Sequence, residues 1–287
     1  MTGATIHEQA AVGLHLSHSV FLLFQELVHG LSGIWLGEHK KMLLYGRLAK
    51  RLRELDLSSF ESYYSTVKHD PKERWAMLDL LTTNETHFFR DSRQFRHLEE
   101  EVIPEWKREA EAGKRPRMLN IWSAGCSTGE EPYSILMVLL DHFPSDSGWS
   151  IRVLGTDISM RVLNKAAQGR WPITQAEEIP PARLKRYMLK GLGHNHKWMQ
   201  AKPELRDRLN FAALNLNDAD YNLKSKFDAV FCRNVLIYFS AASKAEVVRK
   251  LFCHLAPRSR LFLSPVESSA SKLLANAVFP GVYVARE

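Results

Sequence analysis

From residue 118 onward, short apolar β-rich runs alternate with helical stretches, and this alternation restricts the fold more than any other feature of the sequence. The β-rich runs cover residues 118–124, 151–156, 209–214, 227–232 and 261–263. Helical patterns at 130–142, 159–168 and 241–255 follow most of them. Strands that alternate with helices predict a mainly parallel, doubly wound α/β sheet, which binds ligands at the carboxyl ends of its strands.

Two segments depart from this alternation. Residues 1–85 read as helical, with Leu44, Leu48 and Leu52 at four-residue spacing, so we expect an N-terminal helical domain there and the α/β domain over 86–287. Residues 169–208 are rich in proline and glycine and too long for a bare loop in a compact domain. We expect a small inserted subdomain in that segment.

The composition limits the class of protein and its compartment. Three cysteines at unrelated spacings form no disulfide framework and indicate a reducing compartment. We see no signal peptide, and Gln25, Glu26 and His29 interrupt the most apolar early stretch, residues 20–36. We therefore expect a cytoplasmic protein without membrane insertion. The net charge of +7 favours an acidic partner without identifying it.

The strongest local signal is NIWSAGCSTGEEPY at residues 120–133. A strand ends near Gly125, a turn follows, and a helix begins near Gly129. Gly125 lets a ligand approach the backbone, and a helix N-terminus suits a carboxylate. Glu130 and Glu131 either are ordinary first-turn residues or include one that binds a ligand ammonium. S-adenosylmethionine carries both groups, whereas the glycine spacing fits no phosphate-binding loop.

Polar residues also follow the other strands. Asp157 ends the next strand, about thirty residues after Gly125, where an acidic residue commonly binds ribose hydroxyls. The competing interpretation of Asp157 is an N-cap for the following helix. Asn215 and Asn234 end two further strands, on the expected binding edge. The segment LTTNETHFFRD at 81–91 looks by itself like a capped helix start with phenylalanines in the core.

Together these segments resemble the CheR family of chemotaxis-receptor methyltransferases. The matching motifs are TNETHFFR at 83–90, SAGCSTGEEPYS at 123–134, FCRNVLIYF at 231–239 and GIWL at 33–36. Their order and spacing also match, and the resemblance covers about residues 20–285.

The resemblance implies a helical domain followed by a Rossmann-like methyltransferase domain with an inserted antiparallel β-subdomain. It implies methyl esterification of receptor glutamates with S-adenosylmethionine as donor and S-adenosylhomocysteine as product, without a metal. Together with Gly125, the implied cofactor contacts are Asn84, Thr86, Arg90, Glu131, Asp157, Asn215, Leu216, Asn234 and Val235. Arg90 and Tyr238 would lie nearest the transferred methyl group and serve catalysis, Arg90 by steering the substrate carboxylate.

Basic residues between Lys40 and Arg53 have two interpretations. They form either the solvated face of a helix or a surface that binds the acidic helical methylation region of a receptor. The second interpretation assigns substrate binding to Arg47, Lys50, Arg51 and Arg53. We expect the enzyme to be monomeric.

This chain departs from the family pattern after its last long helix. The family has a Gly-Gly turn and a strand ending in Gly-His-Ser-Glu, whereas here Ser264 and Pro265 stand where Gly and His are usual, followed by Glu267 and Ser268. The inserted segment at 190–198 is also unusual, and its docking of a receptor C-terminal peptide stays open.

Two other functions remain as alternatives. A nucleic-acid methyltransferase would use the positive charge on phosphates, but Cys126 and Cys232 lack the Pro-Cys nucleophile pattern, and 233–236 lacks an Asn-Pro-Pro-aromatic strand end. A cofactor-binding signalling module without catalysis would explain the altered Ser264–Pro265 loop.

Overall fold

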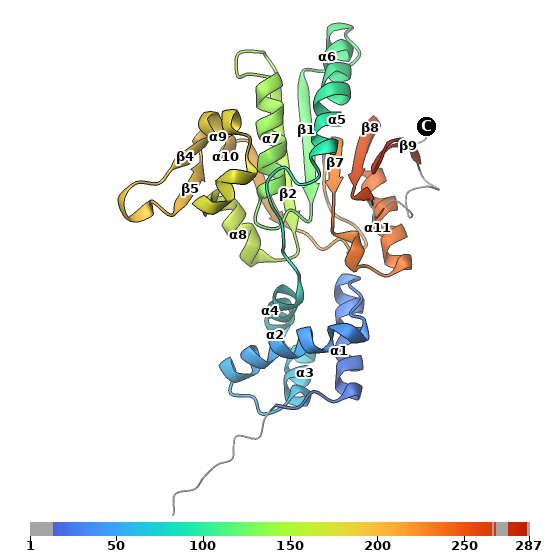
Figure 1. Ribbon diagram of the computed structural model, residues 1–287. Coiled ribbons are helices and arrows are strands. Elements are labelled where there is room, and N and C mark those ends of the chain that lie inside the picture. The colour runs from blue at the N-terminus through green and yellow to red at the C-terminus, as the bar shows by residue number, and fades with distance from the viewer. Residues whose placement is uncertain (1–13, 266, 268–274, 286–287) are drawn as a thin grey trace, which may run out of the picture. The chain divides into compact units, whose positions relative to one another are not determined.

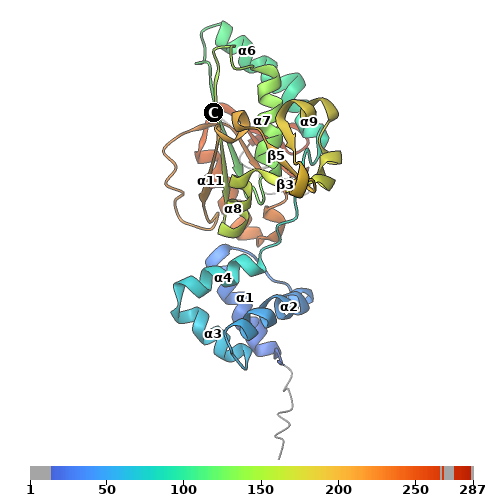
Figure 2. The same ribbon diagram turned by 90° about the vertical axis from the view of Figure 1, so that its left-hand side faces the viewer.

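A computed structural model of the chain describes residues 14–265, 267 and 275–285 and divides into two compact units (Figures 1 and 2). Unit 1 comprises Met1–Gly30 and Leu36–Leu81, and unit 2 comprises Leu31–Trp35 and Thr82–Glu287. The division differs from the expected domain of residues 1–85, whose first 13 residues lie outside the described part. Leu31–Trp35 falls in unit 2 because Ile34 forms an antiparallel bridge with Phe239.

Unit 1 is built from helices, as expected. They are α1 (His18–Ser32), a 3-10 turn η1 (Glu38–Lys40), α2 (Lys41–Glu54), α3 (Phe60–His69) and α4 (Pro71–Leu81). The leucine spacing of α2 places Leu44, Leu48 and Leu52 in the core, each fully buried. Ser59 begins α3 by accepting a hydrogen bond from the N–H of Ser62, which satisfies a donor that the helix leaves unpaired.

A polar contact crosses the interior of unit 1. Arg51 of α2 donates two hydrogen bonds to the carboxylate of Glu73 in α4, at 2.9 and 2.7 Å. The hydroxyl of Tyr63 in α3 donates to the same carboxylate at 2.8 Å. Arg51 therefore joins three helices through a buried acid and is not a member of a freely solvated stripe.

The core of unit 2 is a seven-stranded sheet. Its strands, in spatial order, are β6 (Leu209–Ala213), β2 (Ser150–Asp157), β1 (Met118–Ala124), β7 (Phe227–Cys232), β8 (Leu255–Leu263), β10 (Val282–Ala285) and β9 (Ala275–Phe279). The first five are parallel, whereas β10 runs antiparallel to both β8 and β9. The expected α/β class is confirmed, and the final β9–β10 hairpin was not anticipated from the sequence.

Helices cover both faces of this sheet (Figure 1). One face packs against α5 (Ser92–His97), the π-helical turn Leu98–Val102, α6 (Ile103–Glu111) and α7 (Glu130–His142), and the other against α11 (Ala241–Cys253). Alternation along β7 explains the division, because Ala229 and Phe231 join the first cluster while Val230 and Cys232 join the second. Helix α8 (Met160–Gln168) follows β2.

The insertion forms its own small antiparallel sheet, drawn in yellow tones in Figure 1. Its strands are β3 (Arg170–Pro172), β5 (Trp198–Ala201) and β4 (Met188–Lys190), with η3 (Ile173–Glu178), α9 (Pro181–Tyr187), η4 (Gly193–Asn195) and α10 (Pro203–Arg206) between or after them. Arg183 and Tyr187 of α9 both bond to Asp141 of α7, at 2.7 Å each. These contacts fasten the insertion to the main sheet's helical layer.

The segment at 83–91 is not a helix start. Helix α5 begins only at Ser92, and Phe89 and Asp91 adopt positive φ angles of 51° and 55°. Contacts from distant residues hold this shape: the N–H of Phe88 donates to Glu178 at 2.8 Å, and that of Phe89 to Ser134 at 3.0 Å. Phe88 is nevertheless buried in the core, as the sequence indicated.

None of the helices in the described ranges is both long enough and apolar enough to cross a lipid bilayer.

We predict that Arg51→Ala destabilises the protein by about 1–3 kcal/mol at pH 7, the cost of hydrogen bonds lost to a charged group. The hydrogen bonds from Arg51 hold the pKa of Glu73 in the folded protein below the ordinary value of a glutamate. The stabilisation is therefore present above the pKa of the unfolded chain and is lost as the pH falls through the lowered pKa of the folded protein. Denaturant unfolding at neutral and acid pH measures both effects. Arg53→Ala, an exposed change in the same helix, is the control, and an equal loss in the two variants would contradict the prediction.

Candidate functional site

The parallel strands of unit 2 bring their carboxyl ends to one edge of the sheet. The order β6-β2-β1 proceeds one way from β1, and β7-β8 proceeds the other way, so the strand order reverses between β1 and β7. In open α/β sheets this reversal creates a crevice for ligands. The segments at 84–90, 125–131, 157, 215–216 and 233–238 contain all the site residues expected in unit 2.

The loop after β1 is shaped around Gly125. This residue has a φ of +78°, and a Cβ there would lie 2.4 Å from Cγ2 of Val235. The N–H groups of Gly125 and Cys126 donate to the carbonyl of Thr156 at 2.7 and 2.9 Å. Glycine is therefore required both by the backbone and by the close approach of Val235. The two expected cofactor contacts, Gly125 and Val235, are neighbours.

Asp157 lies at the end of β2 and is 8% exposed. Its carboxylate accepts the N–H groups of Ser127 and Ser159, each at 2.9 Å. Ser159, not Asp157, is the N-cap of α8, because its hydroxyl accepts the N–H of Val162. Each carboxylate oxygen has a second lone pair, so Asp157 can still accept hydroxyl groups from a ligand.

The same loop joins the 83–90 segment to the site. The hydroxyl of Ser127 donates to the carbonyl of Asn84 at 2.9 Å. Asn84 and Thr86 are both half-buried. Ser127 thus connects the motif at 83–90, through its hydroxyl, to Asp157, through its N–H.

The two acids at the start of α7 have different surroundings. Glu130 is 2% exposed and accepts hydrogen bonds from Thr128 and Gln175, so its carboxylate stabilises the fold. Glu131 accepts from the hydroxyl of Ser123 at 2.7 Å and from Arg233 at 3.3 Å. Burial raises the pKa of Glu131, while the positive charge of Arg233 opposes the rise. Of the two acids, Glu131 faces the other site residues.

Arg233 is a central site residue that sequence reasoning missed. Its side chain is 1% exposed and lies 2.9 Å from Asp91 and 3.3 Å from Glu131, and it also donates to the carbonyl of Arg90. A signal was present in the sequence, because an arginine at the end of an apolar strand needs buried acidic partners.

The expected catalytic residues occupy two segments of this edge. Arg90 is half-buried, donates to the carbonyl of Glu85 at 3.3 Å, and acts electrostatically on Glu131. Tyr238 ends the 3-10 turn η5 (Leu236–Tyr238), and its carbonyl accepts the N–H of Trp35 at 2.8 Å. The GIWL motif thus contributes backbone contacts beside Tyr238.

Asn215 and Leu216 are held by their own contacts. The side chain of Asn215 donates to the carbonyl of Leu31 at 2.7 Å and accepts the N–H of Asn217 at 3.0 Å. Leu216 is 6% exposed, and its carbonyl accepts the hydroxyl of Tyr221. A ligand would therefore meet the backbone of Asn215 more readily than its amide, which already holds residues 31 and 217 in place.

The four basic residues expected to bind substrate lie in α2 of unit 1. Arg51 is bound to Glu73, and Arg47 donates to the carbonyl of Leu81 at 2.7 Å. Lys50 is exposed, with Glu54 4.0 Å away, and Arg53 is also exposed. Arg47 and Arg51 thus have structural partners, and Lys50 and Arg53 are the pair that faces solvent.

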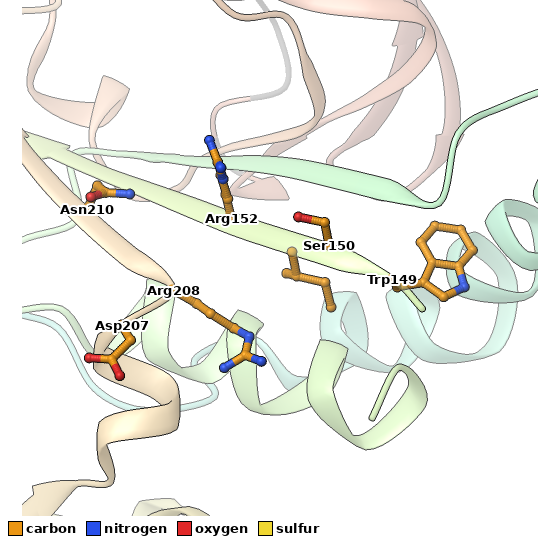
Figure 3. Close-up of a pocket in the computed structure, with 7 residues that line it drawn as sticks. Trp149, Ser150, Arg152, Asp207, Arg208 and Asn210 are labelled. Atoms are coloured by element: carbon orange, nitrogen blue, oxygen red, sulfur yellow. The ribbon is translucent and has the colours of Figure 1, made fainter. Parts of the chain in front are cut away.

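A cavity elsewhere in unit 2 does not belong to this site. It is lined by residues at the beginning of β2 and β6, among them Trp149, Arg152, Arg208 and Asn210. Figure 3 shows Arg152 and Arg208 pointing away from each other, so the two cations do not converge on a ligand. The amino ends of parallel strands lie opposite the edge that carries Gly125 and Asp157. Within the described residues, no three His, Cys, Asp or Glu side chains gather as metal ligands.

Known proteins resemble the chain along nearly all of its length. The model of the CheR methyltransferase SAM binding domain matches residues 84–274, and that of the CheR methyltransferase all-alpha domain matches residues 19–82. A chemotaxis protein methyltransferase of Klebsiella aerogenes is 36% identical over 262 residues, which are 91% of this chain and 87% of the relative. Chemotaxis protein methyltransferase 2 of Pseudomonas aeruginosa is 35% identical over 254 residues, 88% of each chain.

We predict that Asp157→Ala weakens binding of S-adenosylhomocysteine by about 1–3 kcal/mol, because hydrogen bonds to a charged acceptor are lost. Isothermal titration calorimetry on the folded variant measures the change. Asp146→Ala, at an exposed position, is the matched control and should bind like the parent. Unchanged affinity in folded Asp157→Ala would remove Asp157 from the site.

Proposed function

The chain belongs to the CheR methyltransferase family, and we propose that it esterifies glutamate side chains of a chemotaxis receptor at the edge formed by β1, β2 and β7. It is an S-adenosylmethionine-dependent protein methyltransferase, and its products are glutamate 5-O-methyl esters and S-adenosylhomocysteine. The observation that carries the assignment to this edge is the convergence of the Gly125 loop, Asp157 and the 233–238 segment at the point where strand order reverses.

The residues at this edge fit the cofactor. Gly125 leaves room that a Cβ would fill, Asp157 suits ribose hydroxyls, and Glu131 suits the ammonium of the amino-acid part. Oδ1 of Asn234 is buried and has no hydrogen-bond partner among the described residues, so it can accept a hydrogen bond from a ligand. We assign the remaining contacts to Asn84, Thr86, Arg90, Asn215, Leu216 and Val235.

The chemistry requires positioning more than proton transfer. When bound, S-adenosylmethionine supplies an electrophilic methyl group on a sulfonium. A glutamate side chain is ionised at neutral pH, so the chain needs no general base to create the nucleophile. Its residues orient that carboxylate and strip water from it. Arg90 steers the carboxylate through its planar guanidinium, and Tyr238 shapes the neighbouring wall.

The partner that we propose is the acidic helical methylation region of the receptor. The exposed cations Lys50 and Arg53 of α2 would attract it during encounter, whereas Arg47 and Arg51 also stabilise unit 1. Reversing Arg51 would therefore damage unit 1 as well as the surface, so it cannot test recognition alone. We further propose that the enzyme acts as a monomer in the cytoplasm and binds no nucleic acid.

We predict that Arg90→Ala folds and loses methyl transfer about a hundredfold, the usual effect of removing one preorganised electrostatic contact. The assay follows labelled methyl groups from S-adenosylmethionine onto receptor fragments. Arg96→Ala, an exposed change in α5, is the control and should keep full activity. Wild-type activity in Arg90→Ala would refute the role assigned to Arg90.

The same assay distinguishes the product from other methylated molecules, because a glutamate methyl ester is hydrolysed by mild base and a methylated nucleic-acid base is not. Label that resists mild base, or label in nucleic acid, would contradict the proposed reaction.

We predict that reversing Lys50 and Arg53 together to Glu raises the receptor KM and flattens its dependence on salt, since exposed charges act mainly on encounter and are screened by ions. Affinity for S-adenosylhomocysteine should not change. Steady-state kinetics at two salt concentrations gives the result.

The control for this double variant is Lys114→Glu with Arg117→Glu, which makes the same charge change at exposed positions outside α2. If both double variants shift KM equally, net charge alone is responsible. If neither shifts it, the basic face of α2 is only solvated.

A further inference from the structure

The turn after β8 that contains Ser264 and Glu267 is buried and contacts the segment after β7. Ser264 is 3% exposed and Glu267 is fully buried. The turn is closed by its own backbone, because the N–H of Glu267 donates to the carbonyl of Ser264 at 2.9 Å. The N–H of Ser264 donates in return to the Glu267 carboxylate, also at 2.9 Å. Ser268 lies outside the described residues.

The Glu267 carboxylate collects backbone N–H groups from the segment after β7. Its Oε2 accepts the N–H of Asn234 at 3.0 Å, and its Oε1 accepts the N–H of Ile237 at 3.1 Å. A buried carboxylate is costly unless its oxygens are bonded, so these contacts are strongly favoured. One side chain thus fixes both ends of the 234–237 segment.

Residues 234–237 begin with an unusual backbone conformation, which these hydrogen bonds help to hold. Asn234 has a φ of +60°, a left-handed conformation that residues with a Cβ rarely adopt, although asparagine adopts it more readily than most. Asn234 precedes Val235, which packs against Gly125, and η5, which ends at Tyr238. Any release of the 234–237 segment would therefore move the expected cofactor contacts and the expected catalytic tyrosine together.

Ser264 acts on the side chain of the same asparagine. The amide Nδ2 of Asn234 donates to the hydroxyl of Ser264 at 3.3 Å. The contact anchors the amide of Asn234 on one side, and its Oδ1 is left without a partner among the described residues.

We propose that Ser264 and Glu267 are positioning residues for methyl transfer: Glu267 fixes the backbone of residues 234–237, and Ser264 orients the Asn234 amide toward the cofactor. This inference rests on the proposed function, since it assumes that the held segment contacts cofactor and substrate.

The first test is Glu267→Gln, which keeps the size of the side chain and replaces one acceptor oxygen by an amide NH₂ facing backbone N–H groups. We expect the Kd for S-adenosylhomocysteine to rise about tenfold and kcat to fall about tenfold, as for a lost charge-assisted hydrogen bond. The control is Glu246→Gln, on the exposed side of α11, where the acid pairs with Arg249. It should leave both quantities unchanged.

A role in stability alone gives a different result. It would lower the Tm of Glu267→Gln while the folded variant kept the parent Kd and kcat, and this result would overturn the proposal for Glu267. If Glu267→Gln does not fold, Ser264→Ala decides the proposal.

Ser264→Ala removes only the hydroxyl. We expect the Kd for S-adenosylhomocysteine to rise about threefold, the scale of one neutral hydrogen bond, with kcat at saturating cofactor close to that of the parent. An unchanged Kd would overturn the role of Ser264. Calorimetry needs no receptor, so a parent enzyme that binds S-adenosylhomocysteine but methylates no receptor would refute the proposed function and leave these two roles to be judged separately.

Discussion

The buried guanidinium of Arg233 is the contact on which the site depends. It joins the strand end at β7 to Asp91 and the carbonyl of Arg90 on one side and to Glu131 on the other. Taking an arginine out of water costs several kcal/mol, and the fold recovers this only when all partners are in place. The turned shape of residues 83–91 is the shape that brings Asp91 and the Arg90 carbonyl within reach. The backbone of Arg90 and the carboxylate of Glu131 are therefore held by a residue that need not touch either ligand.

Two other acids near the site are held by backbone N–H groups and not by a cation. Asp157 and Glu267 each accept backbone N–H groups from neighbouring loops. Backbone donors are fixed by the fold and carry only a partial charge, so they stabilise a carboxylate without neutralising it. At Asp157, the acid that we propose binds the ribose, such contacts leave a negative potential for hydroxyl groups of a ligand. The same contacts define the shape of the loops, so recognition and loop geometry are not separable at Asp157, whereas the fully buried Glu267 acts on loop geometry alone.

Much of the fold followed from local pattern. The apolar runs at 118–124 and 227–232 coincide with β1 and β7, and the helical run at 130–142 coincides with α7, because periodicity and burial are properties of neighbouring residues. The gathering of these loops at one edge of the sheet was also predictable, since parallel strands place their following loops together. Local pattern failed at residues 83–91, where Ser134, Glu178 and Arg233 determine the backbone. It failed again at Arg51, whose helical spacing indicated solvent but whose partner Glu73 lies in another helix.

The contacts within the site join residues that are far apart in the sequence, and this affects how the protein folds during its synthesis. Arg233 bonds to Asp91, which lies 142 positions earlier in the chain, and to Glu131, which lies 102 positions earlier. Gln94 donates to the carbonyl of Leu263, which lies 169 positions later. Non-local contacts of this kind form late and slowly, because the entropy of closing long loops must be overcome first. On the ribosome, Asp91 and Glu131 emerge well before the arginine that pairs with them, and Asn234 emerges before the acid that holds it. The contacts that hold this edge are thus complete only when residue 267 has been synthesised, because a shorter chain lacks the acid that holds the backbone of Asn234 and Ile237.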